Sequence, residues 1–395
     1  MGAGGGKILY SPNGIHSNMP FDIKIENILP PTDVQDPDAV ALVFLNSIGY
    51  MSRGYDPKTP VESVRSSVPF RLFMDCLMGH PGKDWRVEDL AQELGTSIPT
   101  VYRHLGKLQA YDIIDEDVGD DGKSVHLKHY SLPGAWKVTE ANVTASMENI
   151  KRSVETIQAL LERTGSGKTE GQPADSHRTF CIRICGAPPE ADDGTNVDEH
   201  IKRFLHNIEY LTTREGTPSD EDKVAFRLFK ECFIERPDKV WAIDELIVKL
   251  GTTKPTIYRY VNELDAMGLL DRVVVEETAP TKKGFRLRYG KLTRAWEFVE
   301  AYIKVAMDNY RATVEHLQRL VEARMAEGDG KGKTKATGED EVAERATDAS
   351  PETAVGAEMA NKAKGKGKKN KKKKDDSRAK AKVKAKRPAA RPDKG

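Results

Sequence analysis

The sequence predicts a mainly α-helical protein with small antiparallel β-hairpins, an α+β fold built from two tandem copies of one unit and followed by a basic tail. Three observations predict it. Residues 70–115 match residues 226–271 without a gap, and 19 of these 46 positions are identical. A seven-residue apolar pattern recurs at the end of both copies, and the composition then changes abruptly to Lys, Gly and Ala. Because a repeat fixes the architecture, it is interpreted before any other pattern.

The repeat sets the predicted domain boundaries. Copy one spans residues 21–163 and copy two residues 180–325, so each is about 140 residues long, enough for a core of its own. Residues 1–20 are predicted to be a flexible N-terminus, and residues 164–179, rich in Gly, Ser, Thr and charge, a linker. Each copy divides into a strand-and-helix lead-in (180–215 in copy two), a central unit (68–131 and 224–291) and a long helix (133–163 and 293–325).

Each lead-in begins with a short alternating strand, Phe21–Ile25 in copy one. Asp36 and Pro37 then supply an N-cap and a first-turn proline for a helix. Two helices of the central unit follow, Pro69–Met78 and Val87–Leu94. Gly95 suits the left-handed turn that ends a helix.

The third helix of the central unit begins at Thr96 or Ser97, with Pro99 in its first turn. Two strands follow it, predicted at Asp112–Val118 and Ser124–Tyr130 in copy one and at Leu269–Glu276 and Gly284–Tyr289 in copy two. A helix, a short Gly-containing turn, a second helix and a β-hairpin form the signature of a winged helix-turn-helix, with the last helix in the recognition position. The sequence therefore predicts two tandem winged-helix domains.

The long helices carry apolar residues at alternating steps of four and three. Such a seven-residue seam is typical of a helix that pairs with another helix, and each copy carries the matching seam. The pair forms either within one chain, giving a pseudo-dimer, or between two chains, giving a homodimer. The seam residues are Val143, Met147, Ile150, Val154, Ile157 and Leu161 in copy one, and Ile303, Met307, Tyr310, Val314, Leu317 and Val321 in copy two.

Residues 89–108, Asp-Leu-Ala-Gln-Glu-Leu-Gly-Thr-Ser-Ile-Pro-Thr-Val-Tyr-Arg-His-Leu-Gly-Lys-Leu, resemble the helix-turn-helix of arsenic-repressor-like (ArsR-type) winged-helix regulators, and residues 245–264 repeat the pattern. The resemblance covers roughly 65 residues of each copy and is specific to the superfamily. It implies double-stranded DNA as the partner, with paired terminal helices placing two recognition helices in successive major grooves. Two features depart from the family. The recognition helices lack the cysteine pair of metal-sensing members, and the lead-in is not part of the usual pattern.

Exposed positions early in each recognition helix are expected to contact base edges and phosphates, together with cations of the hairpins. Thr-x-Tyr-Arg recurs there in both copies; the alternative is that these surfaces bind only protein. Copy two is expected to be the stronger half, because the hairpin of copy one is acidic. The predicted residues are Ser97, Thr100, Tyr102, Arg103, His104, Lys107 and Lys123 in copy one, and Thr253, Lys254, Thr256, Tyr258, Arg259, Tyr260, Asn262, Lys282, Lys283, Arg286 and Arg288 in copy two.

The C-terminal region is predicted to be disordered from residue 326. Residues 362–395 hold 14 Lys and 3 Arg against 3 Asp, a net charge of +14 in a chain of net charge +1, so residues 1–361 carry −13. The Lys/Ala/Gly composition is similar to that of linker-histone tails and favours sequence-independent DNA binding. The alternatives are a solubilising tail or a localisation signal; Lys368–Lys374 would serve as a nuclear import signal in a eukaryote.

Other site types are not predicted. No signal peptide or apolar run long enough for a membrane span is present, which favours a cytoplasmic, nucleoid-associated protein. Cys76 and Cys232 occupy equivalent core positions, and Cys181 and Cys185 have no second ligand pair for zinc. His126 and His129 are odd-spaced in a predicted strand and so fall on opposite faces. We therefore expect no cofactor, no metal and no enzyme, but sequence-specific or architectural DNA binding in transcription regulation. The alternative is an interaction module of a chromosome-organising or transcription-initiation complex.

Overall fold

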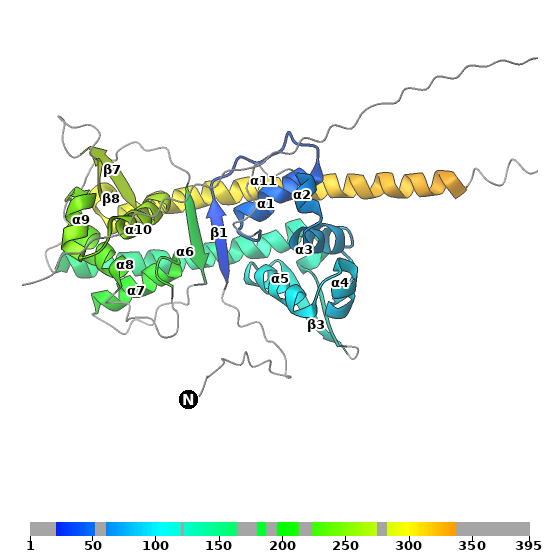
Figure 1. Ribbon diagram of the computed structural model, residues 1–395, viewed down its shortest axis with the longest axis horizontal. Helices are drawn as coiled ribbons and strands as arrows, with labels where there is room; N and C mark the ends of the chain where they lie inside the picture. The colour runs from blue at the N-terminus through cyan, green and yellow to red at the C-terminus, as the bar shows by residue number, and fades with distance from the viewer. Residues whose placement is uncertain are drawn as a thin grey trace, which may run out of the picture. The chain divides into compact units, whose positions relative to one another are not determined.

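The protein is mainly helical with three small antiparallel sheets in the computed structural model (Figure 1). None of the described helices is long and apolar enough to cross a membrane. The predicted N-terminal segment, the linker, Lys282 and the Lys-rich tail lie outside the described residues. The structure describes residues 21–51, 61–119, 122–163, 180–186, 196–212, 223–274 and 283–336.

The lead-ins contain the predicted strand and capped helix. In copy one, the side chain of Asp36 accepts a hydrogen bond of 3.1 Å from the backbone N–H of Asp38, as an N-cap does. Asn196 caps the equivalent helix of copy two through the N–H of Asp198, at 3.0 Å. The elements are β1 (Asp22–Glu26), α1 (Pro37–Ser47) and a short α2 (Val61–Arg65) in copy one, and β5 (Cys181–Cys185) and α7 (Val197–Asn207) in copy two.

The central units have the same element order in both copies, three helical segments followed by a hairpin whose second strand also pairs with a two-residue strand. Copy one contains α3 (Val68–Arg71), η1 (Leu72–Met78), β2 (Trp85–Arg86), α4 (Val87–Leu94), α5 (Ile98–Ala110), β3 (Ile114–Gly119), β4 (Gly122–Leu127) and η2 (Lys128–Tyr130). Copy two contains α8 (Val224–Arg227), η4 (Leu228–Ile234), β6 (Trp241–Ala242), α9 (Ile243–Leu250), α10 (Lys254–Ala266), β7 (Leu270–Val274), β8 (Lys283–Leu287) and η5 (Arg288–Gly290).

Two features of the central units differ from the prediction. The first helix of each central unit continues as a π-helix, η1 or η4, instead of remaining α-helical. The first hairpin is shorter than its alternating residues suggest, because Asp112 before it has a φ of 62° and His129 after it has a φ of 54°. Both residues lie in the left-handed region, which interrupts a strand. His129 therefore lies outside β4 and exposed, whereas His126 lies within it and is buried.

A hydrogen bond shared by the two copies explains the recurring Trp. The indole Nε1 of Trp85 donates a hydrogen bond of 3.1 Å to the backbone carbonyl of Cys76, and that of Trp241 donates one of 2.7 Å to Cys232. Both cysteines are fully buried, and burial raises the pKa of each thiol to about 12. They are therefore protonated core residues that anchor the two-residue strand to the π-helix.

The long helices, α6 (Leu132–Arg163) and α11 (Leu292–Ala336), pack against each other within the chain. All seam residues predicted from the sequence are buried. Reciprocal hydrogen bonds show that the helices run antiparallel: the N–H of Leu132 donates to Gln318 at 3.3 Å, and that of Leu292 donates to the equivalent Gln158 at 3.2 Å. The two copies are thus related by approximate twofold symmetry. Past Ala326, where we expected the helix to end, α11 continues to Ala336, since extending a helix requires no new nucleus.

The lead-ins join the copies across this symmetry. β1 pairs antiparallel with β5, and Lys24 lies opposite its own equivalent, Arg183. α1 of copy one packs on α11 of copy two, and α7 of copy two packs on α6 of copy one. In the first of these contacts, Arg324 forms a 2.8 Å ion pair with Asp38. The lead-in, which the family resemblance does not cover, therefore fastens each copy to the long helix of the other.

Candidate nucleic-acid interface

The third helix of each central unit is positioned by the turn before it. In copy one, α4 ends at Gly95, whose φ of 61° lies in the left-handed region that favours glycine. Extended backbone at Ser97 and the proline at position 99 then begin α5. Copy two repeats this geometry, with Gly251 at a φ of 63° followed by Thr253. The same local chemistry thus sets the entry angle of α5 and α10.

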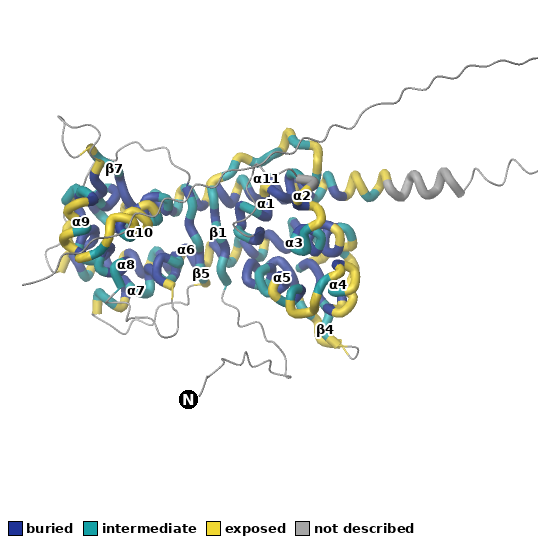
Figure 2. Tube along the Cα trace, viewed as in Figure 1, coloured by how far each residue is buried: buried dark blue, intermediate teal, exposed yellow. Residues whose placement is uncertain are grey.

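The first turns of α5 and α10 present the predicted polar residues to solvent. Figure 2 shows exposed positions along both helices. Ser97 and Thr100 are linked through their hydroxyl oxygens at 2.9 Å, and Thr253 and Thr256 are linked in the same way at 2.9 Å. The exposed predicted residues are Ser97 and Arg103 in α5 and Thr253, Lys254, Tyr258, Arg259 and Asn262 at or in α10; Thr100, Tyr102 and Thr256 are half-buried.

Arg103 and Arg259 are equivalent and exposed, and neither forms an ion pair within the part of the chain that the structure describes. A guanidinium nitrogen of Arg103 lies 3.4 Å from Nε2 of His104. The guanidinium of Arg259 stacks over the ring of Tyr260, 4.4 Å from its centroid. Since nearby aromatic or imidazole groups orient both side chains without neutralising them, both charges remain available to a ligand.

Two predicted contact residues face the core instead. His104 is only 8% exposed, and its ring lies 6.1 Å from that of the buried Tyr50. Its equivalent Tyr260 is half-buried and lies 5.9 Å from Tyr210, the equivalent of Tyr50. Both positions follow an apolar residue by three and precede one by four, so they belong to the inner face of the helix. They are therefore corrected from base contacts to packing residues.

His104 and Lys107 also differ from the prediction in their charge. Burial, followed by the nearby Arg103 and Lys107, lowers the pKa of His104 to about 4, so it is neutral at pH 7. Lys107 is half-buried and donates a hydrogen bond of 3.2 Å to the backbone carbonyl of Tyr50. Burial also lowers the pKa of Lys107. Lys107 thus ties α5 to the lead-in, and its ammonium is directed away from the exposed helix face.

The second hairpin does not present the cations that its sequence suggests. Arg288 is 5% exposed and donates hydrogen bonds to the backbone carbonyls of Gly268 at 2.6 Å and Leu270 at 3.0 Å. Arg286 is half-buried and lies directly opposite Asp271 in the ladder. Asp271 is fully buried, and both arginines approach its carboxylate within 4.0 Å. A buried carboxylate requires cationic partners, so these arginines are corrected from phosphate contacts to fold-stabilising groups.

Each hairpin has one further predicted cation among the described residues, Lys123 in the first and Lys283 in the second. Lys283 is exposed at the start of β8. Lys123 is half-buried and forms a 2.8 Å ion pair with Glu116, so its charge is partly neutralised within the first hairpin. Asp115 and Asp117 on the same hairpin are exposed. The expected difference in charge between the hairpins therefore persists, although it rests on fewer basic residues than predicted.

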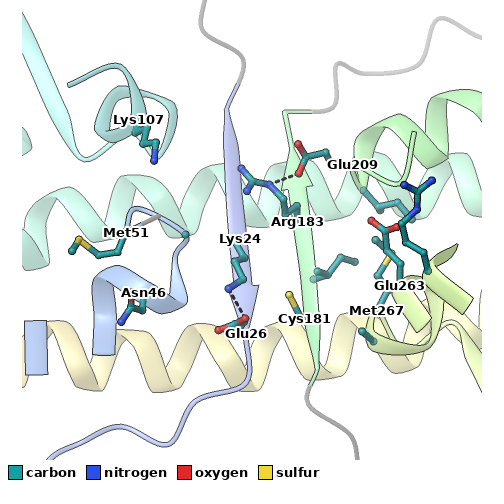
Figure 3. Close-up of a pocket in the computed structure, with 15 residues that line it drawn as sticks. Lys24, Glu26, Asn46, Met51, Lys107, Cys181, Arg183, Glu209, Glu263 and Met267 are labelled. Atoms are coloured by element: carbon teal, nitrogen blue, oxygen red, sulfur yellow. Dashed lines mark ion pairs between the residues drawn. The ribbon is translucent and has the colours of Figure 1, made fainter. Parts of the chain in front are cut away.

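A cleft of about 820 Å³ opens where the copies meet, and the sequence did not reveal it (Figure 3). β1 and β5 lie side by side at its centre, with Lys107 on one side and Glu263 on the other. Lys24 is paired with Glu26, and Arg183 with both Asp22 and Glu209. Lys24 and Arg183 at the centre of the cleft are therefore already neutralised by carboxylates. The recurrence of Ile-Lys-Ile as Ile-Arg-Ile was the sequence signal that these strands are equivalent.

Comparisons with family models, with curated proteins and with solved structures found no match to this chain.

Proposed function

We propose that this chain binds double-stranded DNA through two winged helix-turn-helix units, with α5 and α10 as recognition helices. The element order supports the proposal: α4, a glycine turn, α5 and then the β3–β4 hairpin, with the same order in copy two. The long helices that pair within the chain take the place of the paired terminal helices expected from the family resemblance. The chain thereby carries two equivalent helices related by approximate twofold symmetry, as a site with two half-sites requires.

The observation that carries the proposal is the repeated face of α5 and α10. Each copy exposes an arginine without an ionic partner among the described residues, Arg103 or Arg259, one position after a tyrosine. Arginine is the side chain most suited to bidentate contacts with guanine and with phosphate. Packing alone does not require an exposed arginine at the end of the same Thr-x-Tyr-Arg sequence in two copies that otherwise differ at most positions.

The Lys-rich residues 362–395 add a separate contribution in this proposal. Their net charge of +14 displaces counterions from any duplex, so the affinity they add depends on salt and not on sequence. In a regulator, the affinity added by residues 362–395 must be smaller than the affinity added by α5 and α10 at preferred sites. An architectural protein does not need this difference. A chromatin crosslinking profile distinguishes the two, because a regulator gives sharp peaks and an architectural protein broad coverage.

The test separates the recognition helices from the tail. Preferred duplexes are first selected from a random pool, and affinities are then measured by fluorescence anisotropy at two salt concentrations. Arg259→Ala combined with Tyr258→Ala should weaken preferred sites by roughly 1–3 kcal/mol and leave random duplexes almost unchanged. Deleting residues 362–395 should weaken all duplexes about equally and flatten the salt dependence. Arg319→Ala, which removes an exposed arginine from the long helix α11, is the matched control and should change neither affinity.

A protein-interaction module is the second candidate, and the charge of the body favours it. Residues 1–361 carry −13, which opposes the approach of a polyanion. If deleting the tail abolishes binding and Arg259→Ala has no effect on any sequence, the recognition helices do not contact DNA. The interaction module would then be the better assignment.

A further inference from the structure

We propose that Asp84, Asp117 and His126 bind a first-row divalent metal ion, such as Zn²⁺ or Mn²⁺, beside the first hairpin. The three residues come from different parts of one sheet: Asp84 directly precedes β2, Asp117 lies in β3 and His126 lies in β4. β4 is the central strand of this sheet, so the histidine lies between the two carboxylates. One ligand atom of each residue lies within 4.8 Å of the other two.

The spacing of the ligand atoms suits a shared ion. Nδ1 of His126 lies 3.2 Å from a carboxylate oxygen of Asp84 and 3.5 Å from one of Asp117. Two donors about 2.1 Å from a metal, at an angle near that of a tetrahedron, are about 3.4 Å apart. One imidazole and two carboxylates form a donor set that suits zinc and manganese. Both carboxylates are more than half exposed, so they can rotate toward an ion without moving the backbone.

The buried imidazole points to a ligand independently of the carboxylates. His126 is 6% exposed, and its Nδ1 has no hydrogen-bond partner among the described residues, although it faces both carboxylates. Its ring stacks on Tyr130, with centroids 4.5 Å apart and planes inclined by 11°, which fixes its orientation. A buried ring nitrogen without a hydrogen bond is uncommon. A metal ion between the carboxylates would accept its lone pair.

Copy two shows that the shared fold does not require this cluster. By the register of the repeat, Asp84, Asp117 and His126 correspond to Val240, Val273 and Arg286. The second sheet forms with the same strand order around two valines and an arginine. All three ligand types therefore occur at one place in copy one and none of them at the equivalent place in copy two.

A bound ion would also change the charge of the hairpin. A divalent cation would cancel the charge of Asp117 on the hairpin and of Asp84 beside it, and this hairpin faces phosphate if the proposed function is correct. This consequence rests on the DNA-binding proposal, whereas the metal site itself does not.

The test is a calorimetric titration of the full chain, freed of metal with a chelator, with Zn²⁺ and separately with Mn²⁺. We expect one equivalent per chain. Asp117→Val, which introduces the residue of copy two at an exposed position, should weaken that binding at least ten-fold. Asp115→Asn is the matched control, since it removes a carboxylate from the same strand outside the cluster, and it should leave the affinity within about two-fold.

A second readout identifies the ligands. Co²⁺ bound at the site should give a visible absorption band that is lost in His126→Arg, with circular dichroism showing that this variant remains folded. If no saturable equivalent binds, or if Asp117→Val and Asp115→Asn have the same effect, the three residues do not form a metal site. Because no DNA is present, failure here leaves the proposed function standing, and failure of the Arg259 test leaves the metal site standing.

Discussion

The two hairpins occupy equivalent places in their copies, but the aspartate at the same position is buried in one and exposed in the other. In copy two, Asp271 is fully buried, opposite Arg286 in the ladder and 3.2 Å from Arg288. In copy one, the equivalent Asp115 is exposed, opposite His126 and 3.5 Å from Lys128. The number of basic residues in a hairpin therefore does not give the charge that it presents to a ligand.

The difference extends to the helix behind each hairpin. The guanidinium of Arg288 lies 4.0 Å from the ring centroid of Phe298 on α11, in addition to its bonds to the backbone. The position equivalent to Phe298 in α6 is Val138, which offers no ring. In copy two, Arg286 and Arg288 thus stabilise the fold around Asp271, while copy one keeps the carboxylates Asp115 and Asp117 at the surface.

The largest expected effect comes from removing the buried carboxylate. Asp271→Ala leaves two half-buried or buried arginines without their counter-ion and should lower the free energy of unfolding by about 3–5 kcal/mol. Asp115→Ala, the same change in copy one, should cost less than about 1 kcal/mol, because Asp115 is exposed and Lys128 keeps Asp112 as a second partner. Urea denaturation measures both. Equal losses of unfolding free energy in the two variants would show that the aspartate has the same role in both hairpins.

The next effect concerns the seam that holds the copies together. Met147 and Met307 are 6% and 7% exposed and line an opening of about 270 Å³ between α6 and α11. Replacing Met307 by Asp should lower the free energy of unfolding by about 2–4 kcal/mol, because it places a charge among apolar side chains. Thr144→Asp, at an exposed position on the same opening, is the control and should be nearly neutral.

The same seam predicts the state of assembly. Because α6 pairs with α11 of its own chain, light scattering should give the mass of one chain, 43.9 kDa, independent of concentration. A mass that doubles with concentration would instead require the helices to exchange partners between chains. Met307→Asp would then also change the mass.

Much of the arrangement could be predicted because local chemistry determines it. The seam of each long helix, the cap at Asp36 and the left-handed turn at Gly95 all follow from residues close together in the chain. The crossed packing of the lead-ins could not be predicted, since it joins segments far apart in the chain, 286 residues in the case of Arg324 and Asp38. The roles of Arg286 and Arg288 were also missed, because they depend on how deeply the sheet buries Asp271.

In the candidate site, too, some residue positions were predicted correctly from the sequence and others were not. Helical spacing correctly placed Arg103 and Arg259 at the surface. His104 was wrongly assigned, although its position three residues after Val101 and four before Leu108 was visible in the sequence. A polar side chain does not by itself indicate exposure, whereas the helical period indicates the core. Periodicity is therefore a better guide than residue type at such positions.

His104 and its counterpart Tyr260 give the two copies different responses to pH. The unfolded chain protonates His104 near its ordinary pKa of 6.5, whereas the folded chain does so only near 4. The unfolded state therefore binds more protons in between, and stability falls as the pH drops through this interval. Between pH 7 and pH 5 the loss should be about 2 kcal/mol. His104→Tyr, which introduces the residue of copy two, should remove this part of the loss in urea denaturation at the two pH values.

The smallest effect is the difference between the two proposed recognition helices. Arg103→Ala should weaken a preferred duplex less than Arg259→Ala does, by roughly 0.5–1 kcal/mol, because the exposed Asp115 and Asp117 beside α5 weaken its hold on phosphate. Replacing Asp117 by Val in the wild-type chain should strengthen binding, most at low salt, where repulsion is least screened. Anisotropy titrations at two salt concentrations measure both differences. If Arg103→Ala proves as costly as Arg259→Ala and Asp117→Val changes nothing, the acidic hairpin does not face the DNA, and the two halves bind as equals.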